Sequence, residues 1–260
     1  MKSFLKNYKK NIVTAFLIVT VVAIGTSQAT PVPLGTAADF AVLGGSGVTN
    51  TGSSTFTGDV GSWPTPSVSG ITASMVNGIL YLAPDPATDN AHTDFIAAYN
   101  AAKNAPGGVA GGELGGATLT PGVYTYGAGA ATWTTAGTTL TLNAFGDSSA
   151  QWIFQIGTTL ITPANATVLL INGASANNVF WQVGSSATLG ANNTFAGNIL
   201  ADASIGFGGG TLDGRALAGA AVTISVAEDI SVPTTTVPEP ATLCLLGFGA
   251  LSLIRRKRRA

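Results

Sequence analysis

The sequence predicts an all-β fold: a β-solenoid with three parallel sheets and one α-helix packed alongside. Three observations support this prediction. Short apolar strands, broken by Gly, Asn, Asp or Ser, fill the chain after Gly115. Three kinds of strand recur there in the same order, which indicates stacked repeats. One alanine-rich segment has the apolar spacing of an amphipathic helix.

The first 29 residues have the features of a secretory signal peptide. Four lysines precede an apolar run over residues 12–24, and Ser27-Gln28-Ala29 places small residues before the expected cleavage site. An uncleaved membrane anchor is the alternative, but this run is short of the ~20 residues that span a bilayer as a helix. We therefore expect signal peptidase to remove residues 1–29.

The C-terminal residues 238–260 combine three features in a fixed order. Pro238-Glu239-Pro240 precedes a short apolar run, and five basic residues, 255–259, follow it just before the last residue. This arrangement resembles the PEP-CTERM sorting tail of Gram-negative bacteria. The resemblance implies recognition by an exosortase and removal of the tail; a permanent single-span anchor is the alternative. Because basic residues stay in the cytoplasm, the body is expected outside, extracellular or at the cell surface.

The body between these segments, residues 30–237, is acidic and nearly free of bases. It holds eleven acids against two bases, Lys103 and Arg215, so its net charge is −9 although that of the whole chain is −1. Such a body lacks the basic surface that nucleic acids need. The only cysteine, Cys244, lies in the C-terminal segment, so no disulfide forms within the body. Nothing in the sequence indicates a cofactor or a metal.

The predicted helix covers about residues 88–104. Phe95, Ala98, Tyr99 and Ala102 follow the spacing of one apolar helix face. Thr88 is the expected N-cap, and the Pro-Gly-Gly sequence at 106–108 ends the helix. A single amphipathic helix must bury its apolar face against another element.

The strands after Gly115 fall into three kinds. The first comprises residues 139–143, 167–171 and 194–200; the second 122–126, 151–156, 178–183 and 203–207; the third 131–135, 158–162, 186–190 and 210–214. Residues 214–218, 221–225 and 228–232 form a shorter last turn. Bulky residues at neighbouring positions of the second kind, such as Trp152 and Ile153, indicate that both faces of that sheet are covered, one of them by the helix.

In a solenoid, strands of one kind stack ~4.8 Å apart and alternate side chains point inward and outward. In the third kind of strand, one row of leucines is then expected to point inward: Leu160, Leu189 and Leu212. One row of threonines beside it is expected to point outward: Thr159, Thr188 and Thr211. An ordinary β-sandwich is the alternative, but its strands would not align in threes. Residues 34–83 do not follow this repeat of strands closely, and we expect them to extend the stack from one end or to be inserted in it.

Several stretches of the body resemble the microbial ice-binding protein family, the secreted antifreeze β-solenoids of bacteria, fungi and diatoms. They include LGTAADFAVLGGSGVTNTG near the start, DFIAAYNAA in the helix, and NVFWQVGSSATLG followed by FAGNILA. The resemblance covers residues from about 34 to 232. It implies a right-handed, three-faced, discontinuous β-solenoid with the first coil out of order and a helix alongside. It also implies adsorption to ice through one flat face.

The third kind of strand is the candidate ice-binding face. Threonine suits this role because its side chain is stiff, its methyl group excludes bulk water and its hydroxyl anchors one ordered water. Charged groups would hold hydration shells of their own. The expected ice-binding residues are Thr132, Thr134, Thr159, Thr188 and Thr211. Thr139, Thr141 and Thr167 on the first kind of strand are the rivals, and exposed threonines are also common in strands without a binding role.

Other functions find less support in the sequence. His92 lies on the helix without a nucleophile or catalytic partner. Asp213 follows a glycine-rich run, but the calcium-binding pattern occurs once and imperfectly, which favours a tight turn. Acids such as Asp147, Asp202 and Glu228-Asp229 fall in predicted turns and form no catalytic pair. We therefore expect a monomeric, non-enzymatic ice-binding protein whose only membrane contact is its C-terminal segment; an adhesin that binds polysaccharide is the alternative.

Overall fold

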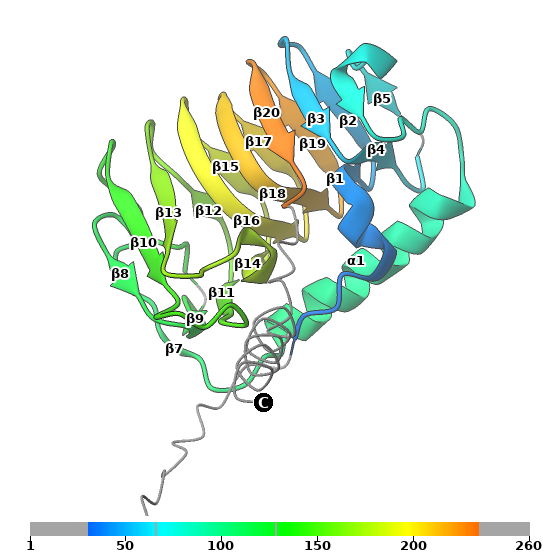
Figure 1. Ribbon diagram of the computed structural model, residues 1–260. Helices are drawn as coiled ribbons and strands as arrows, with labels where there is room; N and C mark the ends of the chain where they lie inside the picture. Colours follow the sequence, from blue (N-terminus) through cyan, green and yellow to red (C-terminus); the bar gives the residue numbers. More distant parts are fainter. Residues whose placement is uncertain (1–30, 66, 128, 234–260) are drawn as a thin grey trace, which may run out of the picture.

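Parallel β-sheets and one α-helix make up most of the computed structural model, which describes residues 31–65, 67–127 and 129–233 (Figure 1). The predicted signal peptide and sorting tail lie outside the described residues. The strand pairs form three parallel ladders. We name them the helix-side ladder, the front ladder and the back ladder, the last two from their places in Figure 1. Short 3-10 helices precede or connect the strands: η1 (Gly35–Asp39), η2 (Ala73–Met75) and η3 (Ala176–Asn178).

The helix α1 (Pro86–Lys103) begins two residues before the predicted start. Asp85, not Thr88, is the N-cap: its Oδ1 accepts from the Ala87 N–H at 2.8 Å, and Pro86 occupies the first turn, where a missing N–H costs nothing. None of the helices in the described ranges is long and apolar enough to cross a membrane. The predicted apolar face of α1 is confirmed, since its four residues are all buried.

The helix-side ladder lies beneath α1. It consists of β7 (Val109–Ala110), β9 (Gly122–Thr125), β11 (Trp152–Ile156), β14 (Val179–Val183), the second halves of β16 (Asn193–Ala201) and β18 (Gly210–Ala218), β1 (Phe40–Gly44) and β4 (Asp59–Ser62). Ile153, Phe180 and Leu200 belong to one buried hydrophobic cluster with Phe95 of the helix. Burial on both faces of this ladder explains its bulky, uninterrupted apolar sequence, as predicted.

The front ladder faces the viewer in Figure 1. It consists of β8 (Thr118–Leu119), β10 (Thr139–Asn143), β13 (Thr167–Ile171), the first halves of β16 and β18, β20 (Glu228–Ser231), β3 (Thr55–Thr57) and β6 (Val76–Asn77).

The back ladder is a separate sheet. It consists of β12 (Leu160–Ile161), β15 (Ala187–Leu189), β17 (Ile205–Phe207), β19 (Ala221–Ile224), β2 (Gly47–Asn50) and β5 (Val68–Ser69). Inward-facing residues of all three ladders form one core. Within it the rings of Phe154 and Trp181, on paired strands, stack at 3.9 Å between centroids.

The first strands of the described chain pair with its last ones. β1 pairs with β18, β2 with β19, and β3 with β20. The N-terminal repeat therefore stacks on the C-terminal repeat, at the opposite end from β8 and β10. This order agrees with the expectation that residues 34–83 extend the stack from one end.

The pairing of β12 with β15 corrects the predicted alignment of the third kind of strand. Ile161, not Thr159, is the partner of Thr188. The register continues that of the preceding strands, where Ile156 pairs with Val183. The corners between them are closely stacked, because a Cβ on Gly184 would lie only 2.3 Å from the carbonyl oxygen of Gly157. The three predicted inward leucines are nevertheless all buried.

Two further assignments are wrong for a single reason: β16 and β18 each run from the front ladder into the helix-side ladder without a turn. Residues 203–207 therefore join the back ladder, and residues 210–214 join the front ladder, where Thr211 pairs with Thr194. From Thr167 to its partner Thr194 the repeat is 27 residues, but from Thr194 to Thr211 it is only 17. Gly197, with φ of 112°, lies at the bend of β16.

Candidate functional site

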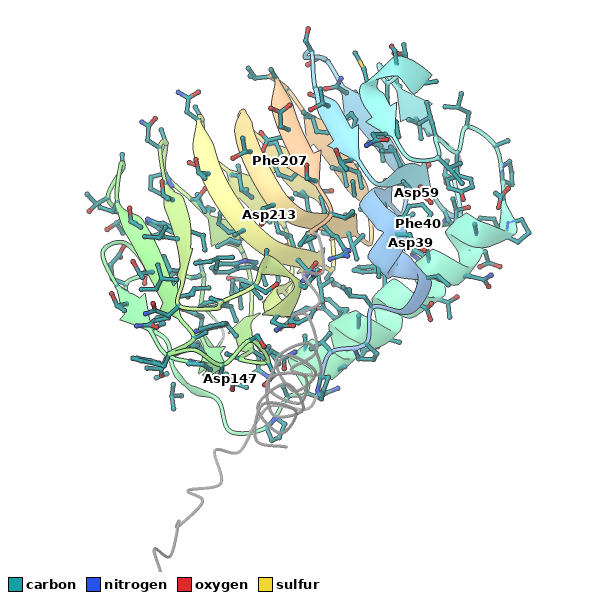
Figure 2. All side chains as sticks on the ribbon, viewed as in Figure 1. Asp39, Phe40, Asp59, Asp147, Phe207 and Asp213 are labelled. Carbon is teal, nitrogen blue, oxygen red and sulfur yellow. The ribbon has the colours of Figure 1, made fainter. Side chains whose placement is uncertain are left out.

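The back ladder is the exposed surface without charge. Its six strands contain no Asp, Glu, Lys or Arg. The helix-side ladder is covered by α1, and the front ladder carries Asp213 and Asp229 on β18 and β20. Figure 2 shows Asp213 on the front strands, and Asp39 and Asp59 near the strands beside the helix. Of the two uncovered ladders, only the back one offers a surface free of strongly hydrated groups.

One outward column of uncharged residues, mostly small, runs along the back ladder. The strand pairs place these residues side by side, in order: Ile161, Thr188, Gly206, Thr223, Thr49 and Ser69. Thr132 extends this column, because the preceding Ala131 bridges to Leu160. Successive strands of a sheet lie ~4.8 Å apart, so the column spans roughly 30 Å. We call the set Thr49, Thr132, Thr188 and Thr223 the threonine column.

Three members of the threonine column have hydroxyls free for water. Within the described part of the chain, the hydroxyls of Thr49, Thr188 and Thr223 make no hydrogen bond to protein, and all three residues are exposed. The Thr132 hydroxyl donates weakly to the Gly112 carbonyl, at 3.3 Å. Because β-branching restricts the χ1 rotamers of threonine, such a column presents its methyl and hydroxyl groups in few alternative positions.

The serines beside the threonine column hold the corner of the ladder together. The Ser186 hydroxyl accepts from the Ser204 N–H, and the Ser204 hydroxyl accepts from the Ala221 N–H, each at 3.3 Å. Each serine thus ties one repeat to the next. These bonds fix the spacing of the strands that carry the column.

The five predicted ice-binding residues do not form one surface. Thr132 and Thr188 lie in the threonine column, and Thr159 lies on its margin, beside Ser186. Thr134 is bonded to Glu113, whose Oε1 accepts its backbone N–H at 2.8 Å. Thr211 lies on the front ladder. The structure therefore brings together two of the five.

Sequence reasoning missed Thr49 and Thr223, which pair directly across β2 and β19. Both follow an apolar residue in similar short sequences, GVTN and AVTI. The similarity of these two short sequences is the signal that could have identified the two threonines as equivalent. It becomes informative only when the first repeat is known to stack on the last, because 174 residues separate the two threonines.

The front ladder has a threonine column of its own. Its outward positions, in order of pairing, are Thr139, Thr167, Thr194, Thr211, Asp229 and Thr55. The predicted rivals Thr139 and Thr167 belong to it, and Thr141 lies in the neighbouring column. Asp229 interrupts this row and accepts a hydrogen bond from the Thr55 hydroxyl. A carboxylate in the row holds its own hydration shell, which distinguishes the front ladder from the back ladder.

Titratable groups elsewhere give no catalytic arrangement. Burial lowers the pKa of His92 on α1, and Asp89 acts in the opposite direction. Asp213 lies in a strand, not in the predicted tight turn, and Glu228 and Asp229 likewise lie in β20. Asp147 does bond turn backbone, accepting from the Ser149 N–H at 2.9 Å. Within the described ranges, no three His, Cys, Asp or Glu residues are placed to hold a metal ion.

Comparisons with known proteins identify the family of the chain. The family model described as Ice-binding-like matches residues 42–228, and the PEP-CTERM protein-sorting motif matches residues 236–259. The chain is 43% identical to an ice-binding protein of Nostoc sp. (strain HG1), covering 85% of this chain and 84% of that protein. It is 34% identical to an ice-binding protein of Flavobacterium frigoris (strain PS1), covering 78% and 76%. The crystal structure of an ice binding protein from an Antarctic biological consortium superposes with a TM-score of 0.73 at 38% identity, covering 80% and 94%.

Proposed function

The chain belongs to the ice-binding-like family, and we propose that it adsorbs to ice through the threonine column of the back ladder. One observation carries this assignment: the back ladder carries exposed threonines in one outward column, with Thr223 and Thr49 on adjacent strands, and its strands contain no charged residue. Adsorption at this surface would inhibit ice growth or recrystallisation.

The proposed mechanism depends on rigidity. Ice is an ordered array of water, and a surface that already holds water in similar positions binds it with little loss of its own conformational freedom. Strand pairing fixes the threonines along one direction, and stiff χ1 rotamers fix each side chain. The methyl groups exclude disordered water, while the free hydroxyls of Thr49, Thr188 and Thr223 hold ordered water.

We infer that the three ladders are the faces of a right-handed, discontinuous β-solenoid with the first coil out of order. Three facts support this: all pairs among the named strands are parallel, successive strands of the chain alternate between ladders, and the first repeat pairs with the last. On this interpretation the back ladder is one face of the solenoid, and its inward side chains anchor it by packing in the core.

The sorting motif indicates an exported protein. We propose a role in export for each end of the chain: a signal peptide at 1–29 directs export, and an exosortase acts on residues 238–260. Residues 30–237 form the ice-binding body. The mature body then acts as a non-enzymatic monomer, outside or on the surface of a Gram-negative cell. The acidic body, with Lys103 and the buried Arg215 as its only bases, supports a role without nucleic acid.

An adhesin that binds polysaccharide is the alternative function. Sugar recognition uses exposed aromatic rings and carboxylates, whereas the outward residues of the back ladder are Thr, Ser, Gly, one Ala and one Ile. The experiment is ice-crystal growth in a dilute solution of the purified protein, with soluble polysaccharides titrated in parallel by calorimetry. Faceted crystals and slowed recrystallisation support the proposal. Round, freely coarsening crystals together with saturable polysaccharide binding would favour the adhesin.

A further inference from the structure

A groove opens on the front ladder where β13 and β16 separate. The two strands pair only through Thr167 and Thr194, although β13 pairs with β10 along all five of its residues. The bend at Gly197 turns β16 toward the helix-side ladder. The Ala196 carbonyl accepts from the indole Nε1 of Trp181 at 2.9 Å, instead of bonding to β13.

This separation leaves one edge of β13 unpaired. Residues 167, 169 and 171 direct their backbone groups to β10, and among the described residues Val168 and Leu170 have no strand partner on the side facing β16. An unpaired strand edge presents backbone N–H and C=O groups at regular intervals, and an extended peptide can bond to them as an added strand. The edge is short, and it opens directly onto the groove.

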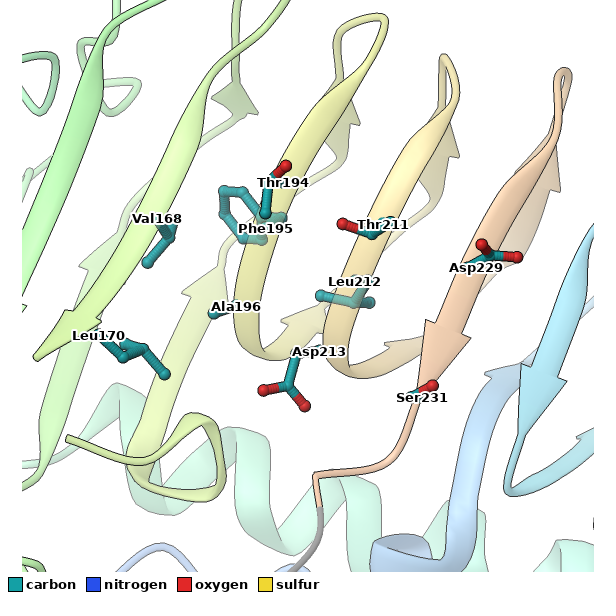
Figure 3. Close-up of a pocket in the computed structure, with 10 residues that line it drawn as sticks. All are labelled: Val168, Leu170, Thr194, Phe195, Ala196, Thr211, Leu212, Asp213, Asp229 and Ser231. Carbon is teal, nitrogen blue, oxygen red and sulfur yellow. The ribbon is translucent and has the colours of Figure 1, made fainter. Parts of the chain in front are cut away.

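The groove has an apolar floor and an acidic rim. Its volume is about 510 Å³, and Val168, Phe195 and Leu212 lie at its base. Figure 3 shows Leu170 and Asp213 on opposite sides of the groove, with Ala196 of β16 between them. Asp229 lies farther along the rim and already bonds to Thr55. Asp213 is thus the carboxylate best placed to meet an occupant of the groove.

The acidic lining of the groove favours a bound molecule with a positive charge. The groove lining contains two carboxylates and no base. Arg215 is 5% exposed, and its Nη1 is bonded to Asn198 and Asn177. Partial burial raises the pKa of Asp213, and the nearby Arg215 only partly offsets this. A basic group on a bound molecule would stabilise the ionised carboxylate and so offset the cost of its partial burial.

We propose that this groove binds an extended peptide bearing a lysine or arginine, which adds to the free edge of β13 and places its basic side chain against Asp213. The apolar floor takes the side chains that alternate with the basic one. The partner is therefore a protein segment with one basic residue flanked by β-branched apolar residues. This site is separate from the back ladder and independent of ice binding.

The test uses the acetylated and amidated peptide Thr-Val-Arg-Val-Thr and the ¹⁵N-labelled protein. We expect saturable chemical-shift changes at the Val168 and Leu170 amides, whose N–H groups lie on the free edge, and at the Trp181 indole. Replacing the peptide's arginine by glutamine should weaken binding by about tenfold or more, since a charge-assisted hydrogen bond is lost. A peptide with proline in place of both valines should not bind, because it cannot pair as a strand.

Two protein variants of equal net charge complete the design. Asp213→Asn should weaken peptide binding by about tenfold or more, while Asp202→Asn, an exposed acid at a turn away from the groove, should not change it. No saturable binding of the arginine peptide would overturn the proposal. So would equal binding of the proline peptide or of arginine amide alone, or equal losses in the two variants.

Discussion

Arg215 and Asn198 face each other on the paired strands β18 and β16, and the Arg215 Nη1 donates to the Asn198 Oδ1 at 2.8 Å. The same guanidinium donates from Nε to the Ala38 carbonyl at 2.7 Å and from Nη1 to the Asn177 Oδ1 at 3.1 Å. Burial lowers the pKa of Arg215 to about 10, so it stays charged at neutral pH. One buried cation thus joins the start of the described chain, η3 and two central strands.

Replacing Arg215 by methionine should lower the free energy of unfolding by about 2–4 kcal/mol, because three acceptors lose their donor, the buried Asn198 among them. Chemical denaturation of the purified protein measures the change. Lys103→Met is the matched control: Lys103 is exposed and lies over the Tyr99 ring, so its loss should cost less than about 1 kcal/mol. Equal losses in the two variants would show that the buried contacts of Arg215 contribute little.

Gln155 should hold the C-terminal end of α1 to the helix-side ladder. Its Nε2 lies 2.8–3.1 Å from the carbonyls of Ala102, Lys103 and Ala105. In Gln155→Met these helix-end carbonyls lose their donor, and we expect about 1–3 kcal/mol less stability. Hydrogen exchange should accelerate in the last turn of α1 and remain unchanged in its first turn. Uniform acceleration along the helix would contradict this local role.

Glu228 should make the protein less stable as the pH rises. Burial, and secondarily the charge of Asp229, raises its pKa to about 7 from 4.5. Between these two values the folded state binds more protons than the unfolded state, so stability is highest below the lower value and is lost up to about pH 7. The free energy of unfolding falls by roughly 3 kcal/mol over this range, and this dependence on pH should disappear in Glu228→Gln. Unfolding by denaturant from pH 4 to 8 compares the two proteins, and identical slopes would refute the assignment.

Much of the fold follows from patterns that local chemistry dictates. The apolar face of α1, the order of the strand kinds up to β15, and the double burial of β11 and β14 were all predictable. Each depends on residues close in sequence. The start of α1 was misplaced by two residues, because Asp85 followed by Pro86 is a stronger N-cap signal than Thr88.

The site was less predictable because register is a property of contacts between repeats. Thr211 was misplaced because β16 and β18 cross between ladders without the turn residues that usually separate strands. Thr223 could not be paired with Thr49 from local sequence, because the first repeat stacks on the last. Choosing between the ladders likewise required the position of Asp229 in the front column.

The measurement that tests the central claim most directly is the thermal hysteresis of four tyrosine variants. Thr188→Tyr and Thr223→Tyr alter the back ladder, while Thr194→Tyr and Thr211→Tyr alter exposed threonines of the front ladder. All four should keep their melting temperatures within a few degrees, since each site is exposed. We predict that each back-ladder variant loses more than about half of its activity, because one bulky side chain interrupts a surface that binds through its rigid continuity. We also predict that both front-ladder variants keep theirs. Full activity in both back-ladder variants, or a loss confined to the front-ladder pair, would contradict the account.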